Sequence, residues 1–89
     1  MKVIYKYELA GIIQMPKDSR ILTVDMQARK TFIWAFVETD NEPVEREFVV
    51  YGTGEHINND AALSYIGTFQ QLGGSLIWHI FEFFNRPQG

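Results

Sequence analysis

The stretch YGTGEHI, residues 51 to 57, carries the residue types best suited to chemistry in this chain. The backbone N–H groups of Gly52, Thr53 and Gly54 could form a nest that binds an anion, with Thr53 and His56 adding side-chain donors. The alternative is a corner at a strand end, where the glycines permit positive φ. A phosphate loop also needs a lysine and a following helix, and neither is present. The pattern favours the corner and leaves the anion site open.

Two polar pairs are further candidates for ligand contacts. Tyr65 and Thr68 flank Gly67, so they lie either on a bulged strand or on the wall of a pocket. Lys17 and Arg20 flank a compact turn, where they are either solvated or contact a phosphate group.

The aromatic residues are numerous, at 13 of 89. Trp34 and Trp78 each combine a large apolar surface with one N–H donor, and most such residues belong to a core. Because one small core needs fewer rings, some are expected to stack on a flat ligand or to fill an interface. His79 is either a hydrogen-bonded structural residue or a ligand contact, and it could share a metal with Glu82 only on a helix.

Catalytic chemistry has little support in the sequence. The chain has no cysteine and two histidines, which argues against a zinc site and excludes thiol chemistry. Ser64 lies in no nucleophile-elbow context, and the acids Glu45 and Glu47 alternate along one strand face beside other acids. We therefore expect a non-enzymatic protein with no catalytic residue, no metal and no cofactor.

The elements that must position these residues are mostly strands. Near-alternation of apolar and polar residues, bounded by turn signals, predicts strands over 2–9, 12–15, 21–27, 31–38, 44–54, 64–70 and 75–84. Residues 75–84 also fit a helical stripe, although their aromatic and β-branched content favours a strand. A helical turn is expected over 58–63, with Asn59 or Asp60 as its N-cap. The chain is predicted to be all-β, or β-dominated with one short helix, as a small antiparallel barrel or sandwich of six to eight strands.

Length and charge limit the number of domains and the kinds of partner that the chain can have. Residues 1–89 are enough for a single domain, and the net charge of −3 argues against a duplex nucleic acid partner. Six positive and three negative charges lie in residues 1–30, whereas five acids and one arginine lie in 38–47. The longest apolar-looking run, LIWHIFEFF, has nine residues and is too short to cross a bilayer. We expect no membrane contact.

Strand 31–38 has an unusual pattern, because both of its faces are apolar. Phe32, Trp34 and Phe36 alternate with Ile33, Ala35 and Val37. A strand of this kind is either central in the fold or covered by a partner. The sequence therefore predicts self-association, as a homodimer or a higher oligomer.

The landmark segments occur in the order and spacing of a known family. These segments are KYEL, PKDSRILTVDMQ, WAFVE, YGTGEHI, YIGTFQ and LIWHIFE. The chain resembles a group of short proteins encoded by bacteriophages and prophages and known only as a domain of unknown function. The resemblance implies a viral origin and the cytoplasm of an infected bacterial host, and it implies no activity. Relatives tend to place a histidine directly after the second glycine, whereas here Glu55 intervenes.

Two functions of different classes remain open. The first is an accessory binding protein that counters a host defence by sequestering a small nucleotide-type ligand or a host protein. The second is a structural or assembly module that acts through homo-oligomer or virion contacts. The sequence names neither the ligand nor the host target.

Overall fold

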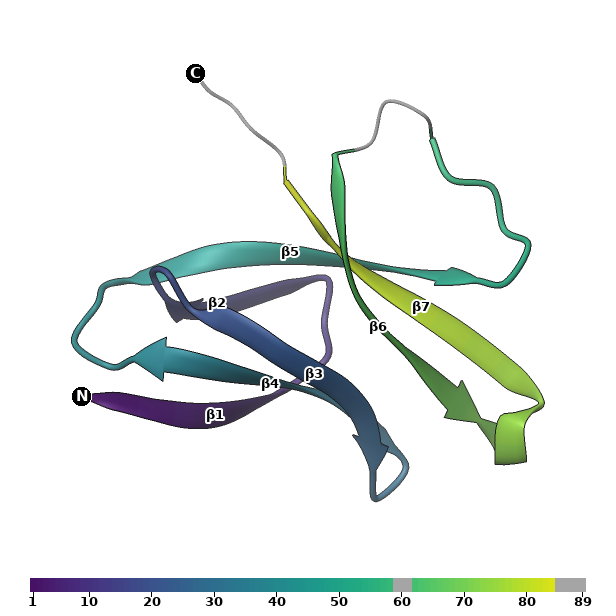
Figure 1. Cartoon of the computed structure of the whole chain (residues 1–89), viewed down its shortest axis with the longest axis horizontal. Coiled ribbons are helices and arrows are strands. Elements are labelled where there is room, and N and C mark those ends of the chain that lie inside the picture. The colour runs from purple at the N-terminus through teal and green to yellow at the C-terminus, as the bar shows by residue number, and fades with distance from the viewer. Residues whose placement is uncertain (59–61, 85–89) are drawn as a thin grey trace.

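The computed structural model of the chain describes residues 1–58 and 62–84. Within these ranges the chain forms seven strands in two antiparallel sheets (Figure 1). The three-stranded sheet has the order β1 (Lys2–Glu8), β4 (Lys30–Glu38), β3 (Arg20–Gln27). The four-stranded sheet has the order β2 (Ile12–Pro16), β5 (Pro43–Gly52), β7 (Leu76–Phe83), β6 (Leu63–Gln71). A short 3-10 turn, η1 (Leu72–Gly74), joins β6 to β7.

The predicted all-β class is confirmed, and the two sheets do not close into a barrel. The ambiguous segment 75–84 is a strand, β7, at the centre of the four-stranded sheet. The helical turn expected from Asn59 or Asp60 falls on residues 59–61, which lie outside the described residues. No helix in the described part of the chain is long and apolar enough to span a membrane.

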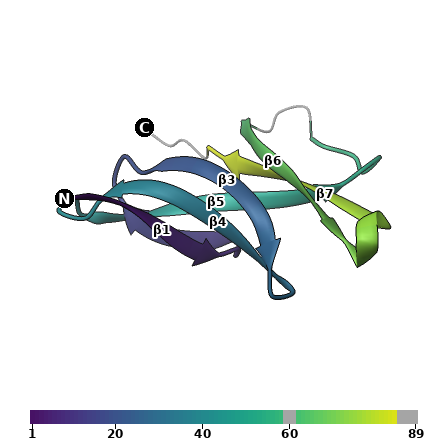
Figure 2. The ribbon, with the colours of Figure 1, turned by 60° about the horizontal axis from the view of Figure 1, so that its bottom comes forward.

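The core lies between the two sheets, where the three-stranded sheet crosses the four-stranded one (Figure 2). Alternation along β4 turns Ile33, Ala35 and Val37 inward, each at most 1% exposed. They belong to one buried cluster with residues of both sheets. Its other members are Ile13, Met15, Val24, Phe48, Phe69 and Ile80. Along β5, Phe48 is buried, and the acids Glu45 and Glu47 lie on the exposed face that their alternation predicts.

A bulge in β3 changes one part of the predicted pattern. Strict alternation over 21–27 would put Leu22, Val24 and Met26 on one face, but the pairing with β4 shifts register between Ile21 and Thr23. The extra residue leaves Leu22 41% exposed, while Val24 stays in the core. Simple alternation fails here because a bulge changes which face the next residue occupies.

The expected irregularity at Gly67 is confirmed. The pairing of β6 with β7 shifts register between Tyr65 and Gly67. A Cβ atom on Gly67 would lie 2.8 Å from Cγ1 of Val24, so β6 and β3 approach each other closely at this point.

A charged pair within the four-stranded sheet lies beside the core. The Arg46 guanidinium binds the Glu82 carboxylate through two N–H donors, and its Nη1 donates to the backbone oxygen of Ser19 at 2.6 Å. The two side chains are 19% and 9% exposed. Because Arg46 comes from β5, Glu82 from β7 and Ser19 from the β2–β3 turn, the pair fixes this turn against the four-stranded sheet.

Candidate functional site

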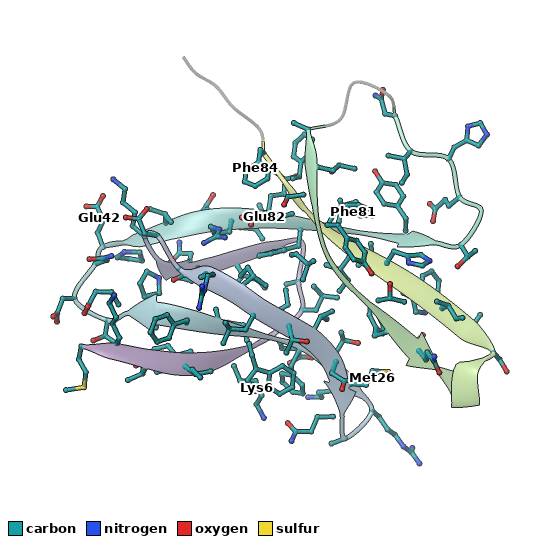
Figure 3. The ribbon with its side chains drawn as sticks, viewed as in Figure 1. Lys6, Met26, Glu42, Phe81, Glu82 and Phe84 are labelled. Carbon is teal, nitrogen blue, oxygen red and sulfur yellow. The ribbon has the colours of Figure 1, made fainter. Side chains whose placement is uncertain are left out.

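The outer face of the four-stranded sheet carries a cluster of aromatic side chains, which we call the aromatic face. Val49 and Tyr65 lie opposite Phe81, and Tyr51 lies opposite His79, two residues away on β7. The Phe81 ring makes edge-to-face contacts with Tyr51 and Tyr65, at centroid distances of 6.0 and 5.5 Å. Tyr65 is 57% exposed. Figure 3 shows Phe81 beside Glu82, which follows it on β7 and turns to the opposite, buried face.

A chain of hydrogen bonds crosses the aromatic face from β6 to the loop after β5. The Tyr65 hydroxyl lies 2.5 Å from Thr68 Oγ1, which lies 3.0 Å from Nδ1 of His79. Nε2 of His79 lies 2.8 Å from Thr53 Oγ1. We call these four residues the hydroxyl–histidine chain. Both ring nitrogens of His79 have a hydroxyl partner, so the ring is held in one orientation in the middle of the face.

The loop that follows β5 forms a tight turn. The Glu55 N–H donates to the Gly52 oxygen at 3.1 Å, and Gly54 has φ of 86°. The Gly52 N–H donates to Glu55 Oε1 at 2.8 Å. The loop therefore holds an anionic group of its own, the Glu55 carboxylate, on one of the three amides of the expected nest. Gly54 meets the conformational requirement of a corner.

A small pocket lies beside this turn. It has a volume of about 340 Å³, and its lining includes Gly52, Thr53, Ile77 and Trp78. A Cβ atom on Gly52 would lie 3.3 Å from the Trp78 ring. Trp78 itself is half-buried and donates from Nε1 to Gln71 Oε1 at 2.8 Å. Gly52 thus lets the strand end lie against the indole.

The other predicted site residues lie elsewhere. The Lys17 backbone bonds to Glu42 and Asn41 at the start of β5, and the Arg20 guanidinium lies 5.9 Å from the Phe36 ring. The ten residues of β5 place this end about 30 Å from the Gly52 turn.

Trp34 and His56 also lie outside the hydroxyl–histidine chain. Trp34 is half-buried on the outer face of the three-stranded sheet, with its ring 6.1 Å from that of Phe32. His56 is exposed.

A family model matches residues 1–88 and describes a domain of unknown function, DUF7352. The chain belongs to this family. Searches of curated proteins and of solved structures gave no match. The DUF7352 assignment covers all seven strands and the aromatic face.

The hydrogen-bond partners of two residues of this DUF7352 chain, His79 and Glu55, could not be predicted from the sequence. The sequence predicts His79 as a hydrogen-bonded structural residue or a ligand contact but does not name its partners, and in the structure it links Thr53 to Thr68 and Tyr65. Glu55 was noted only as an insertion, and it binds the Gly52 amide. The available signal for His79 was its place on the same strand face as Phe81, two residues away.

The two hydrogen-bond partners of His79 are hydroxyls rather than a carboxylate, so the arrangement lacks the orienting acid of a nucleophilic triad. No group of three or more His, Cys, Asp or Glu side chains suited to a metal ion occurs among the described residues.

Proposed function

We propose that this DUF7352 protein is a non-enzymatic binding protein that captures a protein partner on its aromatic face. The observation that carries the proposal is the combination of the exposed Tyr65 ring, packed on the half-buried Phe81, with the hydroxyl–histidine chain on one sheet face. Tyrosine and phenylalanine are enriched at protein interfaces, where rigid rings bury a large area at low entropic cost. The hydroxyl–histidine chain supplies polar groups that fix the orientation of a partner.

The charge of the face indicates the chemistry of the partner. The strand residues that point outward from this sheet include Glu45 and Glu47 and include no lysine or arginine. Both glutamates lie at the β2 end, next to Ile12, which is 57% exposed. A matching partner presents apolar side chains bordered by lysine or arginine.

A small ligand of the nucleotide type is the second candidate. The pocket of about 340 Å³ beside Thr53 and Trp78 is large enough for one ring system. This candidate lacks groups that would bind a phosphate. The Gly52 N–H already donates to Glu55, and the cations Lys17 and Arg20 lie near the other end of β5.

The setting of this binding is also part of the proposal. The resemblance to phage and prophage proteins suggests a chain made in the cytoplasm of an infected bacterium. There, occupation of a host protein by the aromatic face would counter a host defence.

Site-specific photocrosslinking in bacteria that express the protein tests the proposal. A photoreactive phenylalanine at position 65 is expected to give one discrete protein adduct, because Tyr65 protrudes from the aromatic face. The same probe at Leu22, which is 41% exposed on the other sheet, is the matched control and should give no such adduct.

The purified pair then gives the affinity. Tyr65→Ala should weaken partner binding by about tenfold or more, and Tyr65→Phe, which keeps the ring, should weaken it less. Calorimetric binding of a nucleotide, with no adduct at position 65, would replace this proposal by the small-ligand one.

A further inference from the structure

The outer edge of β1 differs from the other sheet edges. β2 has five residues and ends in Pro16, which has no N–H to offer. β3 and β6 both carry bulges, and they approach each other at Val24 and Gly67. β1 has seven residues in unbroken register with β4, no proline and no bulge. Of the strands described, β1 is therefore the one whose free edge is best suited to pair with another strand.

The direction of the backbone groups follows from the bonds at the two ends of β1. Leu9 N–H donates to the Thr31 oxygen at 2.9 Å, and Thr39 N–H donates to the Met1 oxygen at 2.9 Å. In an antiparallel pair, residues point their N–H and C=O groups alternately to one side and the other. Odd-numbered residues of β1 thus bond to β4, and the even-numbered residues point theirs outward.

The outward residues form a self-complementary sequence. An antiparallel pair of identical β1 strands centred on Tyr5 places Lys2 opposite Glu8 and Ile4 opposite Lys6, each twice by symmetry. These are the residues with outward backbone groups, so the four pairs can exchange about eight hydrogen bonds. The Tyr5 side chains, each 46% exposed, meet at the two-fold axis, and on the opposite face of the sheet each Ile4, 59% exposed, faces Lys6 of the other copy.

Neighbouring registers lack this match. A centre at Ile4 places Lys2 opposite Lys6, and a centre at Lys6 places Lys6 opposite itself. Like charges directly opposite are unfavourable. The existing contact between Lys30 and Glu8 spans 3.9 Å between side chains that are about 60% exposed, so it leaves the Glu8 carboxylate able to turn toward a second copy.

We propose that β1 pairs with β1 of a second copy, antiparallel and centred on Tyr5, and so joins two three-stranded sheets into one six-stranded sheet. The partner is this chain itself, selected by the Lys2–Glu8 match and by the exposed Ile4 and Tyr5. This contact is independent of the aromatic face, which lies on the other sheet and stays open in the dimer.

Charge reversal tests the register. Lys2→Glu alone and Glu8→Lys alone each create like-charged pairs at two symmetric positions, and each should raise the dimer dissociation constant by about tenfold. The double variant Lys2→Glu with Glu8→Lys should recover parental affinity. A mixture of the two single variants should form a heterodimer, since opposite charges then meet at both positions. Sedimentation velocity with one labelled variant reads out all four cases.

Cysteine crosslinking tests the same register with a matched control, because the chain has no native cysteine. Tyr5→Cys places two thiols at the axis and should give a covalent dimer on mild oxidation. Val3→Cys should not, because its two copies would lie about 13 Å apart along the strands, beyond the reach of a disulfide. Three outcomes would overturn the proposal. The first is a protein that stays monomeric at about 50 µM, well above the dissociation constant of a stable dimer. The others are a dimer unaffected by charge reversal and equal crosslinking at positions 3 and 5.

Discussion

Gly67 is the residue at which β6 lies closest to β3, and its missing side chain makes that approach possible. Gly67→Ala would place a methyl carbon 2.8 Å from Val24 Cγ1, and we expect it to lower the free energy of unfolding by about 1–3 kcal/mol. Gly11→Ala is the control, since nothing lies within 4 Å of its Cβ position, and it should be neutral or slightly stabilising. Urea denaturation of both variants checks the difference. Equal stabilities would mean that β3 and β6 can separate freely.

The ion pair of Arg46 and Glu82 gives a second prediction for single residues. Glu82→Leu leaves the guanidinium in a poorly solvated position, and it should cost about 3–5 kcal/mol of unfolding free energy. Arg46→Met combined with Glu82→Leu removes both charges and should recover a large part of that loss. Thermal and urea unfolding of the single and double variants measure the coupling. Additive losses in the double variant would contradict a role of charge compensation.

Single residues also mark the limit of prediction from the sequence. Gly54 and Gly67 were correctly recognised as backbone positions, because glycine at a strand end or inside a strand has few other uses. The Gly52–Glu55 bond and the hydroxyl–histidine chain were not, because they depend on side-chain rotamers and on strand order. Thr53 and Thr68 flank His79 only because β7 lies between β5 and β6.

At the scale of the element, the two apolar faces of β4 are buried to different extents. Ile33 is fully buried between the sheets, whereas Trp34 is half-buried on the outer face. Ile33→Ala should cost about 2–5 kcal/mol because it leaves a cavity. Trp34→Ala should cost less, about 1–2 kcal/mol, because the ring is only half-buried and water can fill the space that it vacates. Chemical denaturation gives the order, and a greater loss for Trp34 would mean that its face is a core in solution.

The hairpin between β3 and β4 carries a further prediction. Gln27 pairs with Lys30, so Ala28 and Arg29 form a two-residue loop with φ of 51° and 69°. Such loops favour Asn-Gly, because most L-residues disfavour positive φ. Ala28→Asn with Arg29→Gly should therefore stabilise the protein by about 1–2 kcal/mol. Differential scanning calorimetry checks the rise in melting temperature, and an unchanged or lower value would contradict a strained turn.

Strands were the most predictable elements, and their irregularities the least. Alternation located β4 and β5 to within one or two residues, since each buries one face in the core. The bulge at Leu22 broke the pattern in β3, because an inserted residue leaves no mark in the composition of the strand.

At the scale of the whole molecule, the fold is thin. Its Cα atoms span 41 × 35 × 15 Å, with a radius of gyration of 13.8 Å. A compact chain of this length has a radius of gyration of about 12 Å. The thin shape follows from the two sheets, which overlap over β5 and then diverge (Figures 1 and 2). Both sheets consequently leave one broad face uncovered in the described chain.

This shape makes the mode of self-association measurable by small-angle X-ray scattering. A dimer joined at the β1 edges is long and flat, so its largest dimension should be well above the 41 Å of one copy. A dimer stacked face to face would instead double the 15 Å dimension and remain close to globular. A scattering profile of the globular kind would contradict the edge contact and favour a partner on one of the broad faces.

The hydrogen bonds of the hydroxyl–histidine chain can point in either of two directions, depending on which nitrogen of His79 carries the proton. A neutral imidazole carries its proton on one nitrogen only. With the proton on Nε2, the ring donates to Thr53, accepts from Thr68, and leaves the Thr53 hydroxyl proton free for a partner. With the proton on Nδ1, Thr53 must donate to the ring and can offer a partner only lone pairs. The tautomer of His79 thus sets whether the face presents a donor at Thr53, and a bound partner selects one tautomer, which the ¹⁵N chemical shifts of the ring report directly.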